Sequence, residues 1–173
     1  RLRINGKELR ARVVGEGGNL GLTQKGRIEA WMHGALVNTD AVDNSAGVDT
    51  SDHEVNIKIL LDMLVRQGVI KDRDERNAII EQMTDEVSEL VLADNKGQAK
   101  ALALDTLHSA ADYETWVQFV EGLVTAGIVD RVDAALPTRE EFLASPMRER
   151  GLPRPVLCVL LGTIKNWAFK GAL

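Results

Sequence analysis

The sequence predicts a mainly α-helical protein with a small α/β part at its N-terminus. Two short apolar runs, residues 13–14 and 35–37, each lead into a stretch rich in small and amide residues, as strands do in α/β folds. From Ser51 onward, apolar residues recur at helical spacing. Gly68 separates the two patterns, so we expect an α/β part over residues 1–68 and a helical region over residues 69–173.

A β-hairpin is expected at the start of the chain. Residues 2–6 and 9–15 have strand-like alternation, and they flank Asn5-Gly6, a dipeptide typical of two-residue hairpin turns. The second of these strands ends at a glycine-rich stretch, residues 15–18. We therefore expect a buried strand that passes directly into a tight loop.

One helix, one strand and a long loop should complete the α/β part. Thr23 is placed to cap a helix over residues 24–33. Residues 35–38 form a short second strand. Residues 39–50 are polar and contain glycine, which predicts a loop long enough to suggest a function.

The helix expected from Ser51 to about Gln67 has apolar residues on more than one face. Val55, Ile59 and Met63 lie on one side, and Ile57, Leu61 and Leu64 lie on another. A helix that is apolar on several sides is usually buried between other elements. We therefore expect it to be covered on both sides, and substitution of Ile59 or Leu60 by alanine to cost about 2–5 kcal/mol.

Further helices follow along the chain. Apolar residues at 3.6 spacing predict one helix over residues 73–91, and another is expected over residues 96–109. Residues that favour the first turn of a helix mark several starts: Asp72, Asp112, the capping box Thr138 with Glu141, and Pro155. The region after Gly68 should therefore be a mostly helical body of about five helices.

Composition excludes several classes of protein. The 173 residues carry a formal charge of −5, so we expect no nucleic-acid partner, because no basic stripe exists to replace phosphate counterions. No apolar stretch reaches the ~20 residues of a membrane span, and no signal-peptide pattern opens the chain. The single cysteine, Cys158, excludes an internal disulfide and favours a reducing, cytoplasmic location. The chain starts with arginine and ends within a helical pattern, so we expect a piece of something longer.

The glycine-rich stretch at residues 15–18 allows two interpretations. It is not the dinucleotide fingerprint, because Leu20 stands where that pattern needs its third glycine. Taken alone, the stretch is typical of a turn at a strand end. Glycines also let a ligand approach the backbone closely, and Asn19 offers both a donor and an acceptor. Glu16 is expected to anchor the backbone rather than to act as a base.

The stretch from Ser51 to Glu54 also allows two interpretations. Serine followed three residues later by glutamate, before an apolar run, is typical of a capping box. A helix N-terminus is also a binding site for a carboxylate. Ser51 could serve both roles.

No catalytic group and no metal site are expected in this chain. The three histidines, His33, His53 and His108, lack metal-ligand spacing. Loop and capping roles are expected for Asp40 and Asp43.

Two motifs resemble those of the large bacterial NAD-specific glutamate dehydrogenases. The first is Glu16-Gly17-Gly18-Asn19, which is similar to the Glu-Gly-Ala-Asn stretch of the smaller glutamate dehydrogenases. The second is Asn44-Ser45-Ala46-Gly47-Val48-Asp49-Thr50-Ser51-Asp52-His53-Glu54, which is similar to their Asn-x-Gly-Gly-Val-x-x-Ser-x-x-Glu stretch. Gly18 and Ala46 depart from the smaller enzymes, and the contacts of residues 45–47 stay open.

The resemblance implies a function and a set of site residues. Gly17, Gly18 and Asn19 would lie at the NAD cofactor, and Asn44 and Ser51 at the substrate L-glutamate. Residues 1–68 would be the end of a dinucleotide-binding catalytic core, a Rossmann-like remnant whose fingerprint and substrate-activating lysine lie upstream. The full-length protein would be a homo-oligomer.

Two functions from different classes are consistent with these patterns. The first is NAD-dependent oxidation of L-glutamate to 2-oxoglutarate and ammonia by a longer protein, with the isolated 173 residues inactive. The alternative is a helical assembly or interaction module of a larger protein. Broad exposed apolar stripes would favour the alternative.

Overall fold

The computed structural model describes residues 4–145 and 148–171. Its contacts divide the chain into two compact units. Unit 1 contains the residues up to Asp43 together with those from Ala99 onward, and unit 2 contains Asn44–Gln98. The structure is mainly helical, as the sequence predicted.

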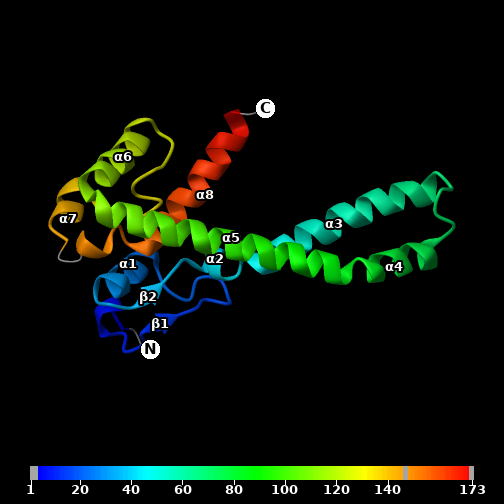
Figure 1. The fold of residues 1–173 in the computed structure, drawn as a ribbon, viewed down its shortest axis with the longest axis horizontal. Coiled ribbons are helices and arrows are strands. Elements are labelled where there is room, and N and C mark those ends of the chain that lie inside the picture. Colours follow the sequence, from blue (N-terminus) through cyan, green and yellow to red (C-terminus); the bar gives the residue numbers. More distant parts are fainter. Residues whose placement is uncertain (1–3, 146–147, 172–173) are drawn as a thin grey trace. The chain divides into compact units, whose positions relative to one another are not determined.

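The N-terminal part of unit 1 is a β-α-β arrangement (Figure 1). Strands β1 (Val13–Val14) and β2 (Leu36–Val37) pair in parallel, and helix α1 (Gln24–Met32) connects them. Both strands and the helix lie where the sequence predicted them. The burial expected for the first strand is wrong in this chain, because Val13 is 67% exposed and Val14 is half-buried in a sheet of two strands. The Gly26 N–H donates to Thr23 Oγ1 at 3.1 Å, so Thr23 caps α1 as expected.

The hairpin predicted around Asn5-Gly6 is wrong for the residues that the structure describes. Gly6–Glu8 form a short 3₁₀ helix, η1, and the Asn5 N–H donates to Glu8 Oε2 at 2.7 Å. Packing explains the difference, because a Cβ at Gly6 would overlap the Gly26 carbonyl oxygen of α1. Close approach of two backbones, rather than a hairpin turn, requires this glycine. Residues 1–3 of the expected first strand lie outside the described residues.

The remainder of unit 1 is helical. It contains the second half of α5 (Thr84–Ala111), α6 (Tyr113–Thr125), α7 (Arg139–Leu143), η2 (Arg148–Arg150) and α8 (Arg154–Gly171). The predicted helix starts are confirmed: Asp112 caps α6, Thr138 and Glu141 form a capping box on α7, and Pro155 lies in the first turn of α8. Their buried side chains form one core with α1, which includes Ile28, Leu102, Val120, Phe142, Leu152 and Leu157.

Unit 2 consists of α3 (Ser45–Arg66), α4 (Arg73–Gln82) and the first half of α5. Asp72 caps α4 by accepting from the Asp74 and Glu75 N–H groups, as predicted. The bounds predicted for the next two helices, residues 73–91 and 96–109, are wrong. Helix α4 ends at Gln82, and α5 is continuous from Thr84 to Ala111. The polar stretch near Asn95 stays helical: Asn95 Nδ2 donates to the Val91 carbonyl, and its Oδ1 accepts from Ser45 Oγ on α3.

The loop predicted over residues 39–50 is also wrong. Helix α2 (Asp40–Asp43) occupies its start, and α3 begins at Ser45, six residues before the predicted start. Short polar side chains make helix-compatible bonds here, since Thr50 Oγ1 donates to the Ala46 carbonyl at 2.7 Å. Gly47 alone does not end the helix.

The burial expected on both sides of α3 is not found in this chain. Leu61 is the one buried residue recorded for α3, whereas Ile59 is 63% exposed and Leu60 52% exposed. The large loss of stability predicted for an alanine at either exposed position is therefore no longer expected.

A matched pair of variants tests this burial. Ile59→Ala should change the free energy of unfolding of this chain by less than about 1 kcal/mol, because the side chain already contacts water. Leu61→Ala, at 7% exposure, should cost about 2–5 kcal/mol through lost burial and a cavity. Urea unfolding followed by circular dichroism measures both, and equal losses would contradict the structure.

Candidate functional site

A buried ion pair anchors the loop between β1 and α1. Glu16 is two residues after the end of β1 and Arg27 is on α1, and their side chains are 3% and 5% exposed. Arg27 donates from Nε to Glu16 Oε2 at 2.6 Å and from Nη2 to Oε1 at 2.9 Å. The pair is bidentate, the strongest arrangement for arginine and a carboxylate. Glu16 also accepts from the Leu22 N–H at 2.9 Å, so it anchors the backbone as expected.

Two aspartates of α2 hold the same loop. Asp40 Oδ2 accepts from the Leu20 N–H at 2.8 Å, and Oδ1 lies 3.1 Å from Arg27 Nη2. Asp43 Oδ2 accepts from the Glu16 N–H at 2.9 Å. Leu20 has a φ of 61°, which is rare for a residue with a side chain, and the bond to Asp40 helps to hold it there. Both aspartates therefore have loop-holding roles, as the sequence suggested.

The hydrogen bonds of this cluster favour the ionised forms of Glu16 and Asp40. The hydrogen bond from Arg27 holds the pKa of Glu16 below its usual value, against the opposing effect of burial. The backbone hydrogen bond from Leu20 lowers the pKa of Asp40. Glu16 is therefore a structural anion at neutral pH and is unsuited to take up a proton as a general base.

The loop between β1 and α1 carries the residues predicted to contact the cofactor. Gly17, Gly18 and Asn19 are all exposed and lie between β1 and α1. A Cβ added at Gly15, Gly17 or Gly18 would meet nothing within 4 Å, and none of the three has a left-handed φ. Neither conformation nor packing in this chain requires glycine there. The three glycines leave a stretch of exposed backbone without side chains.

A hydrogen-bonded chain joins the end of β2 to α8. Arg154 Nε donates to Asn38 Oδ1 at 2.6 Å, and Asn38 Nδ2 donates to Asp43 Oδ1 at 2.7 Å. Sequence reasoning missed Arg27, Asn38 and Arg154. Arg27 carried a usable signal, because a charged residue on the apolar side of α1, next to Ile28, needs a partner of opposite charge.

The residues predicted to bind substrate lie on α3 in unit 2. Asn44 immediately precedes the helix, and Ser51 is exposed within it. The capping box predicted for Ser51 and Glu54 is wrong, because Ser51 is inside the helix and Glu54 pairs with Lys58 instead. Seven residues make almost two complete turns, so Asn44 and Ser51 share one face of α3. The predicted residues thus form two sets, one in each unit.

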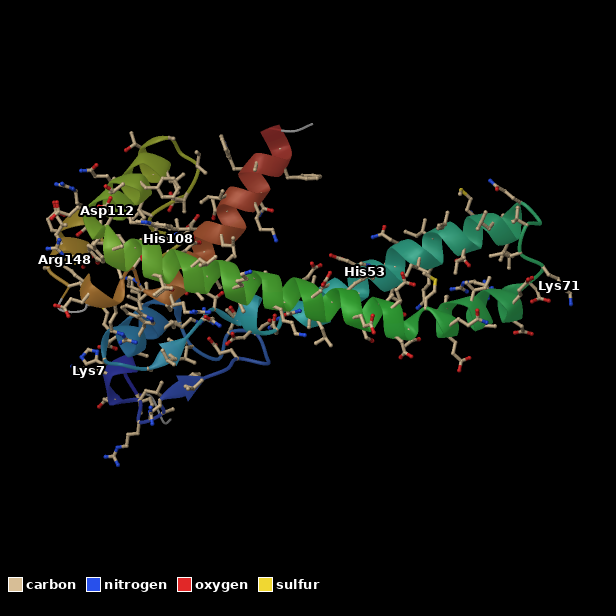
Figure 2. All side chains as sticks on the ribbon, viewed as in Figure 1. Lys7, His53, Lys71, His108, Asp112 and Arg148 are labelled. Atoms are coloured by element: carbon tan, nitrogen blue, oxygen red, sulfur yellow. The ribbon has the colours of Figure 1, made fainter. Side chains whose placement is uncertain are left out.

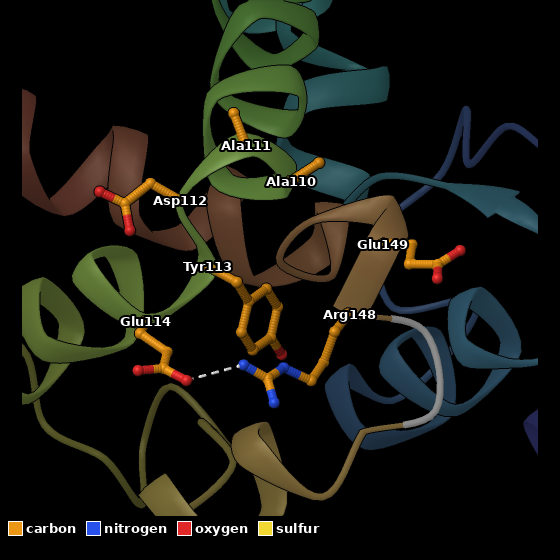
Figure 3. Close-up of a pocket in the computed structure, with 7 residues that line it drawn as sticks. All are labelled: Ala110, Ala111, Asp112, Tyr113, Glu114, Arg148 and Glu149. Atoms are coloured by element: carbon orange, nitrogen blue, oxygen red, sulfur yellow. Dashed lines mark hydrogen bonds and ion pairs between the residues drawn. The ribbon is translucent and has the colours of Figure 1, made fainter.

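Two hollows in unit 1 lie away from these residues. One of about 370 Å³ has Arg148 over the ring of Tyr113, with Arg148 Nη2 3.0 Å from Glu114 Oε1 (Figure 3). A larger one, about 770 Å³, is lined by apolar residues such as Ile28, Met32 and Leu136 with a few charged ones. Neither is lined by Gly17, Gly18 or Asn19.

Comparison with known families adds to this geometry. The family described as bacterial NAD-glutamate dehydrogenase, catalytic domain, matches residues 1–105, more than half of the chain. The chain belongs to this family. The match contains both glutamate-dehydrogenase-like motifs, so the family predicted from residues 16–19 and 44–54 is confirmed.

Relatives of this member of the glutamate dehydrogenase family are long proteins. It is 49% identical over 172 residues to an NAD-specific glutamate dehydrogenase of Halomonas elongata. It is 45% and 44% identical over 164 residues to the proteins of the same name from Mycobacterium tuberculosis and Pseudomonas aeruginosa. These alignments cover 95–99% of the chain but only 10% of each relative. No solved structure matches it significantly. None of the helices within residues 4–145 and 148–171 combines the length and the apolar character that a membrane span requires.

Proposed function

We propose that this chain is part of a longer protein, here called the parent protein, that oxidises L-glutamate with NAD to 2-oxoglutarate and ammonia. The observation that carries the proposal is the match of residues 1–105 to a glutamate dehydrogenase catalytic domain. The relatives named NAD-specific glutamate dehydrogenase support it, because they align with nearly the whole chain.

The loop after β1 fits a cofactor. Gly17 and Gly18 leave the backbone accessible, although neither packing nor backbone conformation in this chain requires glycine at these positions. Asn19 beside them supplies a side-chain amide. We assign these three residues to the NAD side of the site. NAD, when bound, accepts the hydride from the α-carbon of the amino acid. The β1-α1-β2 unit, with its parallel strands, would belong to a Rossmann-like sheet completed by the parent protein.

The start of α3 fits a carboxylate substrate. Asn44 and Ser51 are uncharged donors on one face of the helix, and both are accessible at least in part. We assign them to L-glutamate. Because Ser51 caps nothing, a role in substrate binding is separable from a role in stability.

Two variants of the parent protein test these assignments. Asn44→Ala and Ser51→Ala should each raise the KM for glutamate about ten-fold or more, because each removes a hydrogen bond to a charged ligand. The KM for NAD and the thermal midpoint should change little. Ser88→Ala, an exposed serine on α5, is the matched control. Initial rates of NADH formation measure all of them.

Several results would contradict the proposal. A parent protein that oxidises a different amino acid and ignores glutamate would refute the substrate, and one that forms no NADH would refute the activity. If Ser51→Ala behaves like Ser88→Ala, Ser51 does not bind substrate. We expect the isolated 173 residues to form no NADH, because they contain no phosphate-binding Gly-x-Gly-x-x-Gly loop.

We further propose that the parent protein is a cytoplasmic homo-oligomer, in which residues 1–68 end the catalytic core and residues 69–173 form a helical C-terminal region.

A second function, assembly of the parent protein, is favoured by one observation. Trp167 and Phe169 near the end of α8 are 58% and 67% exposed, and exposed apolar side chains often mark interfaces. Light scattering on the chain tests it: a monomer at high concentration would count against assembly.

A further inference from the structure

Three side chains of metal-ligating type meet in unit 2. The two on α3 lie two residues before and two residues after Ser51, on the opposite face of the helix. Asp49 and His53 are one turn apart on α3, and Asp94 is on the first half of α5. One ligand atom from each of them lies within 4.8 Å of the others. Figure 2 shows His53 on α3, above the helix that carries Asp94. The chain order hides this cluster, since Asp94 is far from the other two in sequence.

The spacing within the cluster suits a metal ion better than a hydrogen bond. His53 Nε2 lies 3.6 Å from Asp49 Oδ1, beyond the usual range of an N–H···O bond. Two ligands of a tetrahedral zinc ion, each about 2.0–2.1 Å from the metal, lie about 3.3 Å apart. The two side chains are therefore within ion-pair distance and nearly at coordination distance, without forming a hydrogen bond.

A second observation points to a missing partner. Asp49 Oδ2 is shielded from solvent, and among the described residues it has no hydrogen-bond partner. Buried carboxylate oxygens are normally paired, because removal from water without a partner costs free energy. A cation bound to Asp49 would satisfy this oxygen.

The surroundings hold the two helices together and attract cations. Ser45 Oγ on α3 donates to Asn95 Oδ1 at 2.9 Å, and Gln98 Nε2 donates to Ser45 Oγ at 3.3 Å. These bonds fix Asp94, the neighbour of Asn95, beside α3. Unit 2 also contains twelve acidic and six basic residues, so a divalent cation is favoured over an anion.

We propose that Asp49, His53 and Asp94 bind a divalent transition-metal ion of the zinc class. One imidazole and two carboxylates form a borderline ligand set that suits Zn²⁺ and neutralises its charge. Three protein ligands leave at least one position for water. The ion would join α3 to α5 inside unit 2.

Calorimetric titration of the 173-residue chain with Zn²⁺ tests the site. We expect binding of one ion, weakened at least ten-fold in Asp94→Asn and in His53→Gln. Both substitutions are close in shape to the natural residue, and Asp94 is exposed, so circular dichroism should be unchanged. His108→Gln, an exposed histidine of α5 in unit 1, is the control and should bind as the wild type does.

A second measurement locates the ion directly. In a proton NMR titration, the ring signals of His53 should shift on addition of one equivalent of Zn²⁺, and those of His33 and His108 should not. Equal affinity in the wild type and Asp94→Asn would overturn the proposal, as would shifts confined to His33 or His108. Absence of binding to the wild type would overturn it as well.

Discussion

Replacement of Arg27 by leucine is expected to lower the free energy of unfolding by about 3–5 kcal/mol. The substitution leaves the Glu16 carboxylate buried and without its bidentate partner. It also removes the cation 3.1 Å from Asp40. Urea unfolding at neutral pH, followed by circular dichroism, gives the value.

A double variant distinguishes the lost charge pair from lost packing. Glu16→Gln combined with Arg27→Leu removes both charges and keeps an oxygen that can accept from the Leu22 N–H. It should recover most of the stability lost in Arg27→Leu. If the double variant is as unstable as the single one, burial of an unpaired charge is not the cause.

The same pair makes stability depend on pH. Arg27 holds the folded-state pKa of Glu16 below its usual value, so the carboxylate favours the folded state above the unfolded pKa of about 4.3. This contribution is lost as the pH falls through the lower, folded-state pKa. Glu16→Gln should therefore reduce the loss of stability on acidification.

Gly151→Ala is expected to cost about 2–5 kcal/mol, from backbone strain and overpacking together. Gly151 has a φ of 82°, where a side chain is unfavourable. An added Cβ would overlap the Thr106 carbonyl oxygen and lie 2.5 Å from Ser109 Oγ, both on α5. Because the carbonyl is backbone within a helix, it cannot move aside easily.

Gly127→Ala is the matched control for the strain alone. Gly127 has a similar φ, 67°, but an added Cβ would meet nothing within 4 Å. It should cost only about 1–2 kcal/mol. Thermal and urea unfolding of both variants give the difference, and an equal loss in the two would show that contact with α5 is unimportant.

Local hydrogen bonds explain which elements could be predicted from the sequence. Thr23, Asp72, Asp112 and Thr138 each cap a helix through a bond to a residue two or three positions away. Such bonds depend little on the rest of the fold. The Asn5-Gly6 hairpin failed because the approach of α1, not the local turn preference, decides the conformation there.

Long-range pairs explain what could not be predicted. Arg154 and Asn38 are 116 positions apart, and Asp94 comes to Asp49 only through the pairing of α3 with α5. No pattern along the sequence predicts such long-range contacts. The apolar residues of α3 misled for a related reason: periodicity indicates which side chains favour burial, whereas partners decide whether they are buried. Ile59 stays largely exposed in this chain.

Unit 1 is built from two segments that are far apart in the sequence, and this has a consequence for synthesis on the ribosome. Gln24 on α1 donates to the Pro155 carbonyl on α8, a separation of 131 residues, and the core of α1 is completed by Leu152 and Leu157. At about 5–20 residues per second, the ribosome needs roughly 7–26 s to make the intervening segment. For that time α1 lacks the part of its native cover that comes from Leu152 and α8. The helices of unit 2, in contrast, find their partners within a shorter stretch of chain.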